Sequence, residues 1–252
     1  MKTKVEEKFS EFFEKWVAKL EEHLQELTKV SNESTVVVRS DPELQALVAK
    51  VTAHLKEYYT VKWAAAHQDV VAFFYPVWLS PLENAYSWVT GWKPSSVFRM
   101  VDSLRKSSGS SSSRQMKSLN DMSEEKVKKI EELRKRIKHE EDKVEREMER
   151  LQVALADRKM VELARMERRI KNGEVVGQMD GLVDVALKGT FSGLEKVMKT
   201  ADCVRLKTLR GVLDELTPLQ CVEFLAATCN FQIQLRYMGK KKASPIDKSN
   251  NA

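Results

Sequence analysis

The chain has 252 residues, of which 42% are hydrophobic and 32% charged, and its formal net charge is +6. The hydrophobic fraction is enough to bury a sizeable core, and the modest charge does not require a nucleic-acid partner. No apolar run reaches the length of a membrane span, and the charged start MKTKVEEKF is unlike a secretory signal. We therefore expect the protein in the nucleus or the cytoplasm.

The first half of the chain carries two long apolar stripes at helical spacing. The first stripe runs from Phe9 to Leu27. A polar linker that includes STVVV (34–38) follows, and Asp41, which precedes Pro42, is the predicted cap of the second helix. That helix is expected to continue to Tyr75, because Pro76 disfavours helical geometry in the residue before it.

The stretch LSPLENAYSW (79–88) admits two interpretations, a nucleophilic serine beside a carboxylate or the start of a helix. Ser80, Pro81 and Glu83 have the spacing of a capping box. The same pattern recurs as Thr217 with Gln220, where a nucleophile would not be replaced in this way. We therefore prefer two helix starts, the first helix ending at Gly91 and a further helix beginning at Pro94 and Ser95.

The second half of the chain predicts three more helices. A Ser-rich flexible loop (107–118) precedes a long charged helix that begins after Ser123, with Ile130, Ile137 and Val144 seven residues apart. A loop (171–181) separates it from the next helix, and the last helix is expected to end at Gly239. The sequence thus predicts an all-α fold, a single elongated bundle of long antiparallel helices over residues 1–239, followed by a disordered basic tail (240–252).

The usual signatures of catalysis and metal binding are missing from the sequence. There is no Gly-rich phosphate loop, the four histidines have no ligand spacing, and three cysteines form no metal motif. We therefore expect no enzyme activity, no metal and no cofactor.

Two groups of residues are candidates for partner binding. The aromatic crowding around Trp63, Trp78, Trp88 and Trp92 fits either core packing at a helix junction or a ligand pocket or partner anchor. A basic segment fits either a solvated face or an electrostatic dock. Its candidate residues are Arg158, Lys159, Arg165, Arg168 and Arg169.

Four segments resemble the Delay of Germination domain of a plant protein family. They read FSEFFEKWVAKLEEHLQEL, LVAKVTAHLKEYYTVKWAAAHQDV, WLSPLENAYSWVTGWKPSSVFRMVDSL and ADCVRLKTLRGVLDELTPLQCVEFLAA. They stand in the family's order, and the pieces W-x-S-P-L-E, G-W-x-P-S, A-D-x-x-R-x-x-T-L and L-T-P-x-Q are specific in combination.

The resemblance implies a regulatory role linked to seed dormancy and abscisic acid. It implies regulatory proteins as partners, among them protein phosphatases of abscisic acid signalling or bZIP factors, and self-association. The domain also forms the C-terminal half of bZIP factors that bind TGACG elements, where a basic region and zipper precede it. Here the matching segments begin near the first residue, so direct sequence-specific DNA binding is not expected.

Some relatives are credited with a haem that histidines of the last helix hold. In this chain Gln232 and Arg236 stand where such ligands could be, and both are poor iron ligands. We therefore expect no haem. The leading hypothesis is a non-enzymatic interaction module in dormancy, germination or stress signalling. One alternative is a transcription cofactor that contacts DNA directly or through a bZIP partner, and another is a helical binder of a small apolar ligand.

Overall fold

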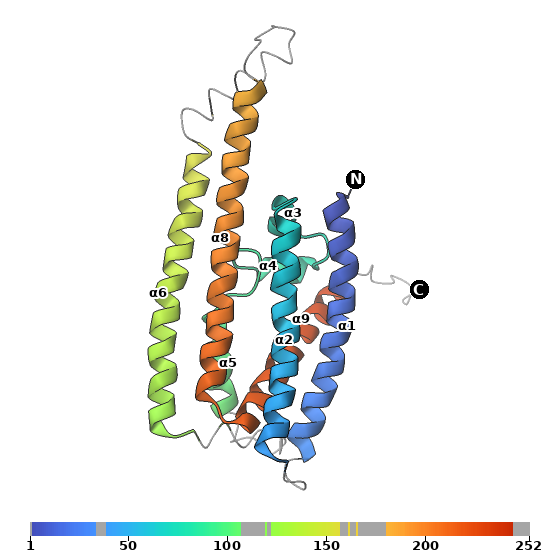
Figure 1. The fold of residues 1–252 in the computed structure, drawn as a ribbon, viewed down its shortest axis with the longest axis vertical. Coiled ribbons are helices and arrows are strands. Elements are labelled where there is room, and N and C mark those ends of the chain that lie inside the picture. Colours follow the sequence, from blue (N-terminus) through green and yellow to red (C-terminus); the bar gives the residue numbers. More distant parts are fainter. Residues whose placement is uncertain are drawn as a thin grey trace, which may run out of the picture.

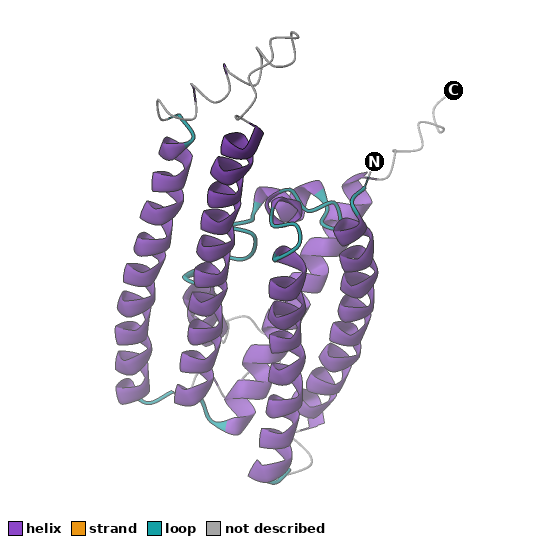
Figure 2. Ribbon diagram, turned by 45° about the horizontal axis from the view of Figure 1, so that its top comes forward, coloured by secondary structure: helices purple, strands orange, loops and turns teal. Residues whose placement is uncertain are grey.

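The computed structural model describes residues 2–33, 39–106, 122–156 and 180–243, together with Leu119, Val161 and Arg165. Within these residues the regular structure is helical and contains no strand (Figure 2). The helices are α1 (Lys4–Glu33), α2 (Asp41–Ala66), α3 (Val71–Phe74), α4 (Pro81–Ala85), α5 (Ser96–Lys106), α6 (Glu124–Ala154), α8 (Asp180–Glu215) and α9 (Pro218–Ala243). The all-α prediction is confirmed.

The long helices form two packed groups in an elongated bundle (Figure 1). Helices α6 and α8 run antiparallel along one side, and α1 and α2 run antiparallel on the other side with α9 packed against both. Helix α2 also contacts α8, which joins the two groups. None of the described helices is both long and apolar enough to cross a membrane.

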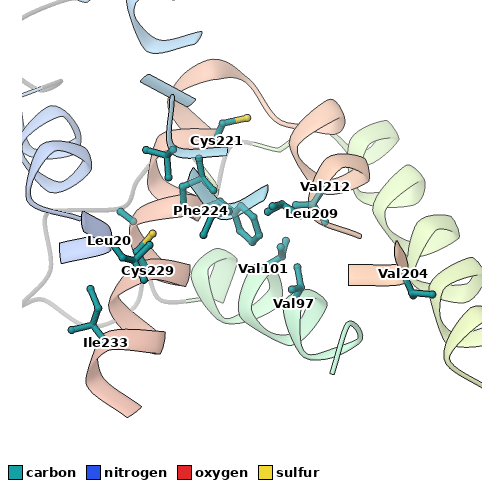
Figure 3. Close-up of a cluster of buried hydrophobic side chains, with 14 of the residues drawn as sticks. Leu20, Val97, Val101, Val204, Leu209, Val212, Cys221, Phe224, Cys229 and Ile233 are labelled. Atoms are coloured by element: carbon teal, nitrogen blue, oxygen red, sulfur yellow. The ribbon is translucent and has the colours of Figure 1, made fainter. Parts of the chain in front are cut away.

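The core is continuous between the two groups. Helix α9 buries its apolar residues on several sides, because it lies between α1, α2, α4 and α5. Figure 3 shows Phe224 of α9 close to Leu209 of α8 and Val101 of α5. In α6 the seven-residue series of Ile130, Ile137 and Val144 is buried, and it packs within the chain as predicted.

Both proline-led helix starts have the geometry of a capping box. The Ser80 hydroxyl accepts a hydrogen bond from the Glu83 N–H (3.3 Å), and the Glu83 carboxylate accepts one from the Ser80 N–H (2.8 Å). Thr217 and Gln220 repeat this exchange at the start of α9 (3.4 and 3.0 Å). Ser80 therefore acts as a helix cap in this structure.

The predicted cap Asp41 is wrong by one residue. Helix α2 begins at Asp41 and its cap is Ser40, whose N–H donates to the Glu43 carboxylate at 3.1 Å. Serine and aspartate are both good helix caps, and the capping box that Ser40 forms with Glu43 places the cap at Ser40.

Three predicted helix ends also differ from the structure. Helix α2 stops at Ala66 instead of continuing to Tyr75. The chain turns after it, and a separate short helix, α3, begins at Val71, where the Asp69 carboxylate accepts a hydrogen bond from the Ala72 N–H (3.2 Å). Helix α4 stops at Ala85 instead of Gly91, since buried side chains hold the following backbone in a turn.

Helix α9 passes through Gly239 and ends at Ala243. The glycine serves packing: a Cβ added there would lie 2.0 Å from the Ser80 hydroxyl oxygen. The tail prediction is thus wrong for residues 240–243. The predicted linker (34–38) and loop (107–118) lie outside the described residues, as do loop positions 171–179 and tail positions 244–252. The last two positions of the predicted loop (171–181) belong instead to α8, which begins at Asp180.

Candidate functional site

An apolar cavity of about 880 Å³ lies inside the bundle. Its wall comes from α1, α2, α4, α5, α8 and α9 and from the segment that joins α4 to α5, and aromatic residues such as Trp16, Tyr58 and Phe224 contribute much of it. Tyr86 and Phe231 also line it although they are 72% and 56% exposed, so the cavity reaches the surface beside them. The volume lies in the range of small-molecule sites.

A cluster of three buried charges borders this cavity. Lys62 of α2 and Asp202 and Arg205 of α8 are each at most 1% exposed. The Asp202 carboxylate accepts from Lys62 (2.9 Å), from Arg205 (2.6 Å) and from the indole of Trp63 (2.9 Å). Burial lowers the pKa of Lys62 to about 8, although the Asp202 charge opposes that shift. One carboxylate thus balances only one of two cations.

Backbone carbonyls of the loop after α4 complete the coordination of the two cations. Arg205 donates to the carbonyls of Trp88, Val89 (2.9 Å) and Trp92 (2.7 Å). Lys62 donates to the carbonyl (3.1 Å) and hydroxyl (2.8 Å) of Thr90. These acceptors stabilise the second positive charge, because charge-assisted hydrogen bonds offset part of its desolvation.

Of the four candidate tryptophans, Trp88 and Trp92 line the cavity, whereas Trp63 and Trp78 do not. Trp78 is buried in the core, with its ring 4.6 Å from Phe9. The other three are partly exposed, and their indole N–H groups donate hydrogen bonds, Trp63 to Asp202 and Trp88 to Glu145 (2.9 Å each) and Trp92 to Tyr59 (3.1 Å). The crowding therefore serves both core packing and a pocket wall, and the most exposed aromatic residues are others, such as Tyr75 and Tyr86.

The candidate basic residues are mostly outside the described part of the chain. Arg158, Lys159, Arg168 and Arg169 lie there, and Arg165 is exposed. The electrostatic dock therefore stays a prediction.

Gln232 and Arg236 of α9, considered above as positions for haem ligands, have other roles. Gln232 lines the cavity. Arg236 is 5% exposed, pairs with Glu14 and donates to the Trp78 carbonyl at 3.1 Å. The cavity wall contains no histidine among the described residues. These residues do not fit a histidine-bound haem, and its absence stays a prediction.

Sequence reasoning missed Lys62, and it included Asp202 and Arg205 only as part of the A-D-x-x-R-x-x-T-L piece, without a role. A signal was present: Lys62 falls on the buried face of α2 with Tyr59 and Ala66, where a charge requires a partner. Asp202 and Arg205 are three residues apart and so share a helix face. The sequence could not show that Lys62 and Asp202, which are 140 residues apart in the chain, come into contact. The described residues contain no group of side chains suited to a metal ion.

Comparison with known proteins gives a consistent set of relatives. A family profile described as seed dormancy control matches residues 6–103. The chain is 54% identical to Protein DOG1-like 4 of Arabidopsis thaliana, over 96% of each chain. It is 26% identical to Protein RESPONSE TO ABA AND SALT 1 of the same plant, over 96% of this chain and 99% of that protein. It is also 28% identical to TGACG-sequence-specific DNA-binding protein TGA-2.1 of Nicotiana tabacum, over 90% of this chain but 45% of that protein.

Proposed function

The chain belongs to the family of seed dormancy control proteins, and we propose that it is a non-enzymatic plant regulator that acts by binding other proteins. Its setting is abscisic acid-linked dormancy, germination or stress signalling, in the nucleus or the cytoplasm. The observation that carries the regulatory role is the 54% identity to a DOG1-like protein over nearly the whole chain. A relative named for its response to abscisic acid and salt supports the hormone link.

The surface beside the cavity supports binding to proteins. Tyr86 and Phe231 are exposed aromatic residues at its mouth, and large aromatic side chains dominate the energetics of protein interfaces. Candidate partners are protein phosphatases of abscisic acid signalling and bZIP factors. The similarity of this chain to TGACG-binding factors supports the second candidate. A second copy of this chain is a further candidate partner for the same surface.

A pull-down with paired variants tests this function. We expect Tyr86→Ser with Phe231→Ser to lose partners that the wild-type protein captures from seed extract, at unchanged helix content. Tyr75→Ser is the control, because Tyr75 is 81% exposed but does not line the cavity. Retention of all partners by the double variant, or equal losses in the control, would contradict the proposed surface.

The cavity supports a second candidate function, the binding of a small apolar ligand. Native mass spectrometry of the purified protein tests it by revealing a co-purified molecule. Gln232→Trp should occupy part of the cavity and reduce the amount of bound molecule, whereas Gln152→Trp, on an exposed face of α6, should leave that amount unchanged. A wild-type protein without bound ligand, and without affinity for apolar probes, would rule this function out.

A further inference from the structure

The segment from Tyr86 to Ser95 forms a non-helical wall between the cavity and the solvent. It lies between the end of α4 and the start of α5, and most of its residues up to Lys93 line the cavity. Tyr86 and Ser87 are exposed. Every other wall of the cavity is formed mainly by helices, so this segment is the wall that can move at the lowest cost.

The middle of the segment is a turn under backbone strain. Trp88 and Gly91 exchange backbone hydrogen bonds (2.6 and 3.3 Å), and the two residues between them have positive φ, 40° at Val89 and 63° at Thr90. This is the geometry of a type I′ turn, which favours Asn-Gly. For a residue with a Cβ each positive φ disfavours the closed turn by roughly 5- to 30-fold, and β-branched residues are unusual there.

The buried cations oppose this strain from the inside. Arg205 and Lys62 together bind the carbonyls of Trp88, Val89, Thr90 and Trp92. Gly91 permits the approach, since a Cβ there would lie 3.0 Å from the Arg205 guanidinium carbon. Strain persists only where the surroundings enforce it, and here two side chains from α2 and α8 do so.

The far end of the segment is fixed separately to α6. The Ser95 N–H donates to Glu141, which is fully buried, at 2.6 Å, and Lys93 pairs with Glu145 at 2.8 Å. The indole of Trp88 joins this anchor, since it also donates to Glu145 (2.9 Å). The backbone carbonyls of the turn are instead bound by side chains of α2 and α8, so these carbonyls can leave their cations while Ser95 stays in place.

We propose that the segment Tyr86–Ser95 is a gate over the apolar cavity, closed when Lys62 and Arg205 hold the strained Trp88–Gly91 turn. Release of the turn carbonyls relaxes Val89 and Thr90 and opens the wall, with Ser95 as the hinge. The gate rests on the second proposed function, because it is useful only if the cavity takes an apolar ligand.

Hydrogen exchange of the Trp88 and Gly91 amides measures the opening without any ligand. Val89→Gly and Val89→Ala differ by one Cβ, and the glycine variant adopts positive φ without strain. Its closed turn should therefore be more stable, and the two amides should exchange about five-fold more slowly than in the alanine variant. This factor already allows for the greater freedom of glycine in the open state. Thr90→Val keeps the shape of the side chain but removes one acceptor of Lys62, and should exchange about five-fold faster. Amides of α9 serve as an internal control for global unfolding.

Stopped-flow binding of 1-anilinonaphthalene-8-sulfonate connects the opening to the cavity. The association rate should rise in Thr90→Val and fall in Val89→Gly by factors that match the exchange data. Equal exchange in the glycine and alanine variants, or probe rates that do not follow exchange, would overturn the gate. If exchange behaves as expected but no probe enters the wild-type protein, the ligand function fails while the strained, held turn is retained.

Discussion

Asp202 balances two buried cations, so its loss and the loss of Lys62 should have different consequences. Asp202→Asn leaves Lys62 and Arg205 without a counter-charge and should lower the free energy of unfolding by about 3–5 kcal/mol. Lys62→Met leaves the Asp202–Arg205 pair intact and should cost less, about 1–3 kcal/mol. Urea denaturation followed by circular dichroism gives both values. A larger effect from Lys62→Met would show that Asp202 is not the centre of the cluster.

His23 should make the protein sensitive to mild acid. It is 3% exposed, its ring lies 5.0 Å from that of His54, and burial lowers its pKa below 6.5. The unfolded chain therefore binds the proton first, so stability is present above about pH 6.5 and is lost as the pH falls through the lowered pKa. His54, Lys50, Lys19 and Glu26 are the other charges that act on it.

Urea midpoints between about pH 7 and pH 5 measure this effect, since histidine titrates in that range. His23→Gln should flatten the dependence, whereas His139→Gln, at an exposed position of α6, should leave it unchanged. An equally steep dependence in His23→Gln would assign the acid sensitivity to other groups.

At the scale of elements, close contacts between helices require glycine at particular positions. Gly239 of α9 faces the cap of α4, where a Cβ would lie 2.7 Å from the Cβ of Ser80, and Gly211 of α8 faces Leu133 of α6. Gly239→Ala should therefore lower the free energy of unfolding by about 1–3 kcal/mol, as overpacking does. Gly189 has open space around it, so Gly189→Ala should instead raise that free energy by about 0.5–1 kcal/mol. Thermal denaturation compares the two, and stabilisation by Gly239→Ala would contradict the tight α4–α9 contact.

At the scale of the whole molecule, groups buried by several helices set the response to alkali. Burial lowers the pKa of Lys62 from 10.5 to about 8, so stability rises with pH from about 8. Burial raises the pKa of Cys221 to about 11 and that of Cys229 to about 12 from the usual 9.0, and also raises that of Tyr58. These groups ionise first in the unfolded chain, so they remove stability above about pH 9.

We therefore expect a maximum of stability near pH 9, measured by urea midpoints between about pH 7.5 and pH 10.5. Lys62→Met should remove the rise, and replacement of both Cys221 and Cys229 by Ala should reduce the fall. A midpoint that is constant from pH 9 upward would contradict the burial of these thiols.

Local chemistry determined the helices and most of their starts. The apolar stripe of α1 and the proline-led caps at Ser80 and Thr217 require only neighbours within a few residues, so the sequence alone predicted them. Helix ends were predicted less well. A glycine or a proline signals an end locally, but Gly239 is there for a contact with Ser80, which lies far away in the chain.

Only the tertiary structure decided the candidate site. Lys62, Asp202 and Arg205 meet because α2 packs on α8, and no local pattern encodes that pairing. The hydrogen bonds from Lys62 and Arg205 to carbonyls of the Trp88–Gly91 turn override the local preference of Val89 and Thr90 for negative φ. The sequence thus determined the helical class, the family resemblance and the apolar faces, because these depend on composition and short-range spacing. The cavity and its wall depend on contacts between distant segments, whose energies arise only when the bundle is assembled.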